Sequence, residues 1–162
     1  MKITRSLFSN QDIQFIIKMH YEAVFWRDRT KRPSFEDSLQ LDEIQSAIKE
    51  LGQRRGDLAV VARKDQAYLG AAWVRYWTDQ EHIRGFIDPT IPVLVIGIAE
   101  DHRGQGIGEQ VLNQLILELR QEGIRNMSLC VSKDNYALRL YKNCGFLVHE
   151  DIGDSFLMVR DI

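Results

Sequence analysis

The 162-residue sequence predicts an α+β fold with a mixed, mostly antiparallel central sheet of about seven strands and helices on both faces. The first observation is the order of the segments: a strand, two helices and three strands, then a helix, a strand, a helix and two strands. The second is the run Val93–Ala99, which is apolar throughout, as is typical of a strand covered on both faces. Such a strand needs a helical layer on each side of the sheet.

The N-terminal segment begins with a predicted short strand, Met1–Leu7. Ser9 or Asn10 can cap the helix that follows, because their side chains accept hydrogen bonds from its first amide groups. Residues at helical spacing give this helix one apolar face: Ile13, Ile16, Ile17, His20, Tyr21 and Val24. Arg27–Pro33 breaks the pattern and predicts a loop.

The next segment predicts a second helix over Phe35–Leu51, ended by Gly52. Its apolar face would comprise Leu39, Ile44, Ile48 and Leu51. Beyond it the period changes to that of strands, and Leu58–Ala62 and Tyr68–Tyr76 predict a hairpin. The polar, irregular stretch Trp77–Ile91 predicts a loop that leads into the apolar strand.

The C-terminal part starts with glycines at Gly104–Gly108, followed by a helix that Gly123 ends. The core stripe of this helix is Ile107, Val111, Leu112, Leu115, Ile116 and Leu119. The sequence then predicts a strand, a short helix and an antiparallel pair of strands: Met127–Val131, Asn135–Asn143, Phe146–His149 and Ser155–Val159.

Composition is that of one globular domain, which we expect to span residues 1–162, with 44% hydrophobic and 27% charged residues. The formal net charge of −2 gives no reason to expect a nucleic-acid partner. Met1–Asn10 lacks the apolar stretch of a signal peptide, and no run reaches the roughly 18 apolar residues of a membrane span. Cys130 and Cys144 show no metal or redox spacing and are interpreted as core residues, so we expect a cytoplasmic protein without a metal or a membrane partner.

The chemistry is concentrated in the turn Arg103-Gly104-Gln105-Gly106-Ile107-Gly108. A strand that runs through glycines into a helix presents unpaired backbone N–H groups at the positive end of the helix dipole, which suits a phosphate or pyrophosphate. A Walker A loop would need Lys and Ser or Thr after Gly108, where Glu109 and Gln110 stand. The dinucleotide-binding fingerprint also fails, because its third glycine would fall on Glu109 or Val111.

Two motifs resemble those of the GNAT superfamily of N-acetyltransferases. Arg103-x-x-Gly106-x-Gly108 after an apolar strand is similar to its acetyl-CoA motif, and Asp134–Phe146, with Leu140-Tyr141 and Gly145-Phe146, is similar to its late helix. Together the motifs cover roughly Val93–Phe146. The resemblance implies the three-layer α/β/α arrangement of that family and acetyl-CoA as the co-substrate.

The resemblance also implies where acetyl-CoA lies. The amide groups of Gly104, Gln105, Gly106, Ile107 and Gly108 would hold the pyrophosphate, with Arg103 in the same motif. The pantetheine arm would pair with backbone at Ile96, Gly97 and Ile98, and the lack of a side chain at Gly97 fits a close approach. Asn135 matches a position that reaches the pantetheine, although it is equally suited to cap the short helix.

In the family's reaction a neutral amine attacks the thioester directly, and the thiol leaves. The resemblance implies that the N–H of Ile98 stabilises the oxyanion and that Tyr141 donates to the departing sulfur. Similar sequences carry a glutamate base after a proline of the central strand, where this chain has Val93 after Pro92. Substitutes in the preceding loop are Asp79, Glu81 and His82, whereas His20, His102 and His149 are interpreted as surface or core residues, so no base is assigned.

The predicted function is therefore transfer of an acetyl group from acetyl-CoA to a small-molecule or peptide amine, and a homodimer is left open. The alternative is a non-catalytic acyl-CoA-binding sensor module on the same fold, which the missing glutamate favours and Tyr141 opposes. A Cys–His hydrolase is disfavoured, because neither cysteine lies at a sharp strand-to-helix turn. Basic residues of the first loop could favour an acceptor with a carboxylate: Arg27, Arg29, Lys31 and Arg32.

Overall fold

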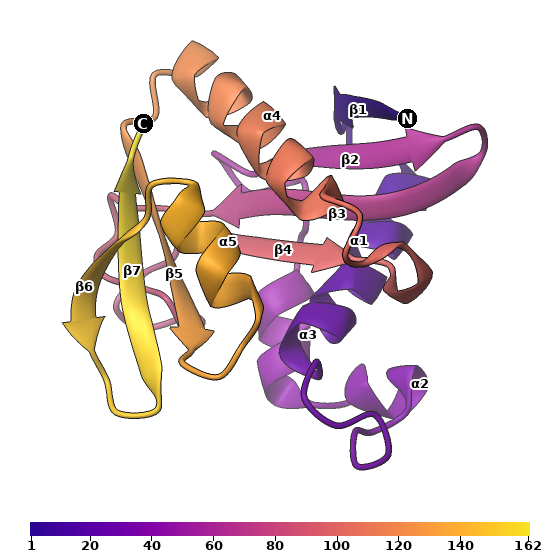
Figure 1. Ribbon diagram of the computed structural model, residues 1–162, viewed down its shortest axis with the longest axis horizontal. Coiled ribbons are helices and arrows are strands. Elements are labelled where there is room, and N and C mark those ends of the chain that lie inside the picture. Colours follow the sequence, from indigo (N-terminus) through magenta and orange to yellow (C-terminus); the bar gives the residue numbers. More distant parts are fainter.

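The computed structural model describes residues 1–162 and contains one seven-stranded sheet in the order β1-β2-β3-β4-β5-β7-β6 (Figure 1). Every neighbouring pair is antiparallel except β4 and β5, so the predicted mixed, mostly antiparallel sheet is confirmed. The strands are β1 (Lys2–Arg5), β2 (Leu58–Lys64), β3 (Ala67–Arg75), β4 (Val93–Ile98), β5 (Asn126–Ser132), β6 (Leu147–Asp151) and β7 (Ser155–Asp161).

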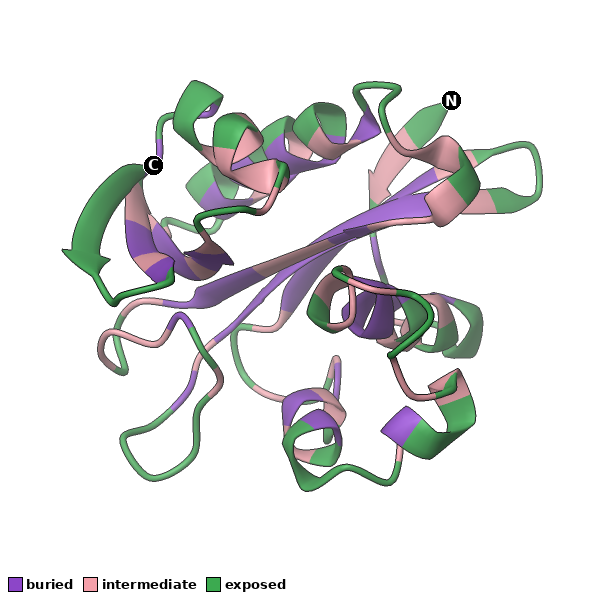
Figure 2. Cartoon of the chain, turned by 60° about the horizontal axis from the view of Figure 1, so that its bottom comes forward, coloured by how far each residue is buried: buried purple, intermediate pink, exposed green.

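Helices cover both faces of the sheet, and Figure 2 shows the buried strands running between them. They are α1 (Asn10–Val24), α2 (Phe35–Ser38), α3 (Asp42–Ile48), the short 3₁₀ helix η1 (Glu100–His102), α4 (Ile107–Gln121) and α5 (Ala137–Asn143). The side chains of β2 alternate between two apolar clusters. Leu58, Val60 and Ala62 pack with α4, whereas Ala59 and Val61 pack with α1. The three-layer arrangement is confirmed.

Helix α4 forms as its pattern predicts. All six residues of the predicted stripe are buried, each no more than 5% exposed, against the larger cluster. Gly123 follows the helix with φ of +73°, a conformation that glycine adopts without strain.

The single helix predicted over Phe35–Leu51 is wrong, because the structure has two short helices, α2 and α3. Side chains satisfy the backbone at the interruption: the Ser38 hydroxyl donates to the carbonyl of Phe35 (2.6 Å), and the Gln45 amide donates to the carbonyl of Leu39 (3.1 Å). Serine competes in this way with the helical ladder.

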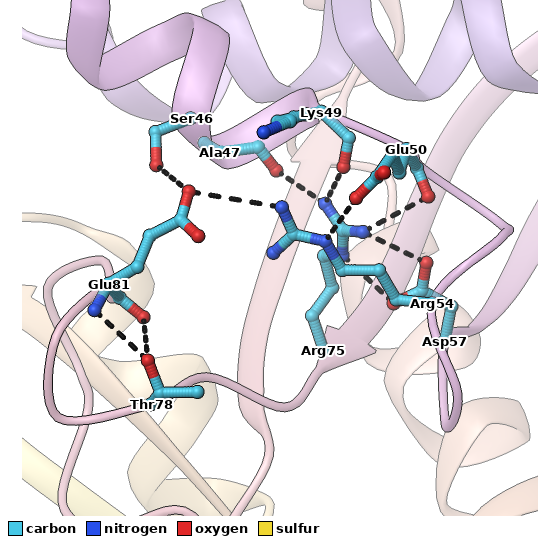
Figure 3. A network of polar contacts seen from close by, with 9 residues as sticks. All are labelled: Ser46, Ala47, Lys49, Glu50, Arg54, Asp57, Arg75, Thr78 and Glu81. Atoms are coloured by element: carbon cyan, nitrogen blue, oxygen red, sulfur yellow. Dashed lines mark hydrogen bonds and ion pairs between the residues drawn. The ribbon is translucent and has the colours of Figure 1, made fainter.

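A buried arginine ties the end of β3 to α3 (Figure 3). The Arg75 guanidinium donates to both carboxylate oxygens of Asp57, at 2.8 and 3.1 Å. It also donates to the carbonyls of Ala47 (3.0 Å), Lys49 (2.9 Å) and Glu50 (3.2 Å), which satisfies groups at the C-terminal end of α3. Helix α3 is thereby held beside the sheet.

Candidate active site

A cleft of about 610 Å³ opens between β4 and β5. The two parallel strands pair only at Val93 and Ser128, and beyond that point they diverge (Figure 1). Both helical layers contribute to the lining, with residues of α1 and α3 from one side and residues of α5 from the other. Divergence leaves the backbone edges of the two strands without partners where the cleft is widest.

The open edge of β4 presents the N–H groups of Ile96 and Ile98. On the other edge the N–H of Ala99 donates to the carbonyl of Leu69 (2.9 Å). Hydrogen-bonded and non-hydrogen-bonded residues alternate along an antiparallel pair, so Ile96 and Ile98 direct their N–H groups away from β3 and towards the cleft. Two of the three predicted pantetheine-binding residues therefore offer backbone donors there.

Gly97 is required for a reason that the sequence did not reveal. A Cβ at this position would lie 2.5 Å from the carbonyl oxygen and 2.6 Å from the Cβ of Met19. The missing side chain therefore lets α1 pack closely on β4, and it lies on the α1 face of the strand.

The glycine turn has the geometry of an anion site. Gly104 and Gly106 adopt positive φ, +71° and +77°, and a Cβ at either would meet no atom within 4 Å. None of the amide N–H groups from Gly104 to Glu109 donates a hydrogen bond within the protein; the first helical bond is from Gln110 to the carbonyl of Gly106 (3.3 Å). These free donors lie at the positive end of the α4 dipole and can bind a phosphate.

Arg103 turns its side chain away from these donors. Its Nη2 donates to the Glu22 carboxylate (2.7 Å), and its Nε donates to the carbonyl of Ile98 (3.1 Å). Arg103 thus joins the turn to α1 and β4. Sequence reasoning missed Glu22, which is only 8% exposed and whose carboxylate also lies 3.3 Å from the Arg32 guanidinium. The sequence did offer one indication of its burial, because Glu22 adjoins the apolar face of the first helix.

Tyr141 and Asn135 lie on the β5 side of the cleft and both line it. Tyr141 is half-buried, and its ring meets Phe146 edge to face with centroids 5.7 Å apart. Burial raises the pKa of the Tyr141 hydroxyl well above its usual value, because the phenolate would lose hydration. The Asn135 side chain accepts from the N–H of Ala137 (2.9 Å), so it caps α5 as well as lining the cleft.

The structure sorts the predicted substitutes for the missing base. Asp79 and Glu81 do not line the cleft. Glu81 accepts from the Ser46 hydroxyl (2.9 Å) and lies 3.8 Å from Arg54, which links the β3–β4 loop to α3 (Figure 3). His82 does line the cleft, exposed and stacked on Phe86 with centroids 4.5 Å apart.

Two residues interpreted as core or surface line the cleft instead. His20 is only 6% exposed, and burial lowers its pKa to about 4. Cys130 is half-buried in the cleft, whereas Cys144 is buried in the core as expected. The tertiary packing places His20 and Cys130 in the cleft, and the periodicity of the sequence could not predict this.

Each basic residue of the loop between α1 and α2 already lies near a carboxylate of the protein. Arg27 pairs with Asp134 and Arg29 with Glu100, so the loop is tied to the segments that follow β5 and β4. Arg32 pairs with Glu22 and Lys31 with Asp28. The expectation that these residues recognise an acceptor carboxylate is therefore not supported by their contacts.

Two further features concern membranes and metals. No helix combines the length and apolar character needed to cross a membrane. No group of His, Cys, Asp and Glu side chains is arranged to hold a metal ion.

Known proteins share this sequence pattern and fold. The family model described as the acetyltransferase (GNAT) family matches residues 21–146. A PaiA N-acetyltransferase from Thermoplasma acidophilum, in complex with coenzyme A, matches with a TM-score of 0.70 and 18% identity over 100% of both chains. A ribosomal-protein-alanine N-acetyltransferase from Brucella melitensis matches with a TM-score of 0.67 and 19% identity, also over 100% of both chains.

A phosphinothricin acetyltransferase of the GNAT superfamily from Sinorhizobium meliloti, in complex with acetyl-CoA, matches with a TM-score of 0.68 and 19% identity. That match covers 100% of this chain and 89% of the other. At such identities the structural matches demonstrate a shared fold. No curated protein matches the sequence.

Proposed function

The chain belongs to the GNAT acetyltransferase family, and from that membership we propose that it transfers an acetyl group from acetyl-CoA to a small-molecule or peptide amine by direct attack in a ternary complex. One observation carries the proposal. The open edge of β4 leads through η1 into a turn whose amide N–H groups have no partner and lie at the N-terminus of α4. A ligand with an extended amide-bearing arm and a pyrophosphate satisfies both sets of donors.

The residues present fit that ligand. The N–H groups of Gly104–Glu109 would hold the pyrophosphate, and the backbone of Ile96 and Ile98 would pair with the pantetheine arm. Coenzyme A or acetyl-CoA is present in two of the three similar structures named above, which supports the assignment. Acetyl-CoA supplies the activated acyl group as a thioester.

The reaction needs a neutral amine, stabilisation of the oxyanion and a hydrogen bond to the departing sulfur, and residues around the open edge of β4 would supply the last two. An attacking amine must be neutral, whereas a lysine-like amine has a pKa of about 10.4 in water. The N–H of Ile98 would donate to the oxyanion that forms at the carbonyl. Tyr141 would donate a hydrogen bond to the departing sulfur, and its raised pKa keeps the hydroxyl protonated for that purpose.

The alternative, a non-catalytic acyl-CoA sensor, rested on valine at the position of a family glutamate. Val93 is 1% exposed and does not line the cleft. A carboxylate at this position would be buried beside the pairing point of β4 and β5. Its absence is therefore weak support for a sensor, and Tyr141 in the cleft favours an enzyme.

Thermal unfolding with acetyl-CoA tests the binding half of the proposal. Saturation at 100 times the Kd should stabilise the protein by about 2.7 kcal/mol, whereas NADH and ATP should not reproduce the shift. A panel of amine acceptors with detection of released thiol tests the transfer half. Acetyl-CoA binding without turnover on any amine would establish the sensor, and no thermal shift would refute both functions.

A further inference from the structure

Strand β4 turns its two faces towards different helical layers. Ile96 and Ile98 pack with the cluster under α4, and Val95 packs with the cluster under α1. Tyr141 packs against the α4-side cluster. The reacting carbonyl at the open edge of β4 would therefore have its sulfur on the Tyr141 side and receive the amine from the α1 side.

His20 lies on the α1 side. Its ring is 6.1 Å from that of Trp73, centroid to centroid, and Trp73 belongs to the α1-side cluster and pairs with Val95 of β4. His20 also lines the cleft. His20 and Tyr141 thus line the cleft from opposite faces of the sheet, together with Ile96 and Ile98 of β4.

The ring nitrogens of His20 are available to a ligand. His20 is 6% exposed, and its ring makes no hydrogen bond within the protein. Among the side-chain nitrogen and oxygen atoms, only Arg63 Nε and Trp77 Nε1 are both inaccessible to solvent and without a hydrogen-bond partner. The His20 nitrogens also have no partner, so they must be accessible to solvent, through the cleft that His20 lines. A buried polar group that lacks a partner costs stability unless a ligand or water satisfies it.

The other proton acceptors of the cleft are worse placed. The Glu22 carboxylate is engaged by Arg103 and Arg32. Glu43 is exposed in the first turn of α3, and His82 is exposed on the β3–β4 loop, so water competes for both. Of these four residues, only His20 is both buried and without a hydrogen-bond partner for its ring nitrogens.

We propose that His20 accepts a hydrogen bond from the attacking amine and takes its proton as the N–C bond forms, an assignment that rests on the proposed acetyl transfer. As the C–S bond breaks, the sulfur is hydrogen-bonded by Tyr141 and acquires a proton from solvent. His20 returns its proton to solvent, so amine and thioester yield amide and thiol.

The protonation state of His20 suits a transient role. Burial lowers the pKa of His20 to about 4, so the ring is neutral near pH 7 and one nitrogen is free to accept. The same burial makes His20 a weak base, so it takes the proton only as the N–C bond forms and the amine nitrogen becomes acidic, and it releases the proton readily.

His20→Phe tests the proposal, because phenylalanine keeps a ring beside Trp73 and deletes both nitrogens. We expect kcat to fall at least about tenfold, since positioned bases contribute about 10²–10⁴-fold, while the KM and Kd for acetyl-CoA stay within about twofold. His149→Phe is the matched control, because His149 is exposed on β6 outside the cleft; it should keep wild-type kinetics.

His20→Gln is the second variant and covers the case in which His20→Phe does not fold. Its carbonyl accepts a hydrogen bond but no proton, so its kcat should lie between those of wild type and His20→Phe. Wild-type kcat in either His20 variant would overturn the assignment. A parallel loss of kcat, Tm and acetyl-CoA affinity in His20→Gln would also overturn it, in favour of packing. A wild type that turns over no amine would instead refute the proposed function, and His20 with it.

Discussion

Tyr141 lies at the surface of the cleft but in contact with Phe146, and this position decides what its hydroxyl can do. An ordinary tyrosine titrates near pH 10 and could in principle protonate a thiolate, whose conjugate acid has a pKa of about 8.5. Burial raises the pKa of Tyr141 further. Full proton transfer to sulfur becomes less favourable, whereas hydrogen bonding from an always protonated hydroxyl is preserved.

Tyr141→Phe should therefore lower kcat at least about tenfold, less than the roughly 10²–10⁴-fold of a positioned acid because the hydroxyl donates a hydrogen bond and no proton, and leave acetyl-CoA affinity nearly unchanged. The ring and its contact with Phe146 remain, so the fold should be intact. Because the folded pKa is raised, wild-type kcat should show no fall from tyrosine ionisation below about pH 10. Steady-state kinetics over pH 6–10 on both proteins measures this; wild-type turnover by the variant would remove Tyr141 from the mechanism.

The turn that begins α4 is the element on which cofactor binding depends. Its glycines are not there because neighbours crowd them, since a Cβ at Gly104 or Gly106 would meet open space. They are there because positive φ aims consecutive N–H groups at one point. The same helix ends at Gly123, which has nearly the same φ as Gly106 and is equally uncrowded.

Gly106→Val and Gly123→Val form a matched pair. Each forces a side chain into the left-handed region and should cost about 1–2 kcal/mol of stability. Only Gly106→Val disturbs the turn, so it should weaken acetyl-CoA binding more than about tenfold, a loss of roughly 1.4 kcal/mol, while Gly123→Val binds like wild type. Chemical denaturation and calorimetric titration measure the two quantities. Equal affinity in the two variants would refute binding at the turn.

At the scale of the molecule, the sheet joins two clusters, one of 19 buried residues under α4 and one of 7 under α1. Strands β2 and β3 contribute alternate residues to both, so neither cluster can form without the other's strands. The buried Arg75 adds α3 to the same sheet. We propose on these grounds that residues 1–162 form a single domain.

A single domain of this size should unfold in one cooperative transition. The chain has three tryptophans, so Trp26 and Trp77 are first replaced by phenylalanine. The remaining Trp73 belongs to the smaller cluster and is 3% exposed, so its fluorescence reports the α1 side, whereas far-UV circular dichroism reports all elements. The two signals should give coincident urea curves. Earlier loss of the fluorescence signal would indicate that the α1 side unfolds separately and would contradict the proposal.

Several elements of this protein are determined by the local sequence alone. The stripe of α4, the β2–β3 hairpin and the stop at Gly123 follow from residue periodicity and from glycine conformation, which neighbouring residues set. The glycine turn and Tyr141 were recognisable because each belongs to a motif of closely spaced residues, Arg103–Gly108 and Asp134–Phe146.

Tertiary structure decided the rest, because it depends on residues far apart in the chain. The cleft exists because β4 and β5 separate after Val93 and Ser128, which no local pattern records. His20 belongs to the apolar face of α1, and only the packing of that helix on Gly97 turns it towards the cleft. The hydrogen bonds of Arg75 likewise connect three segments that meet only in the folded chain.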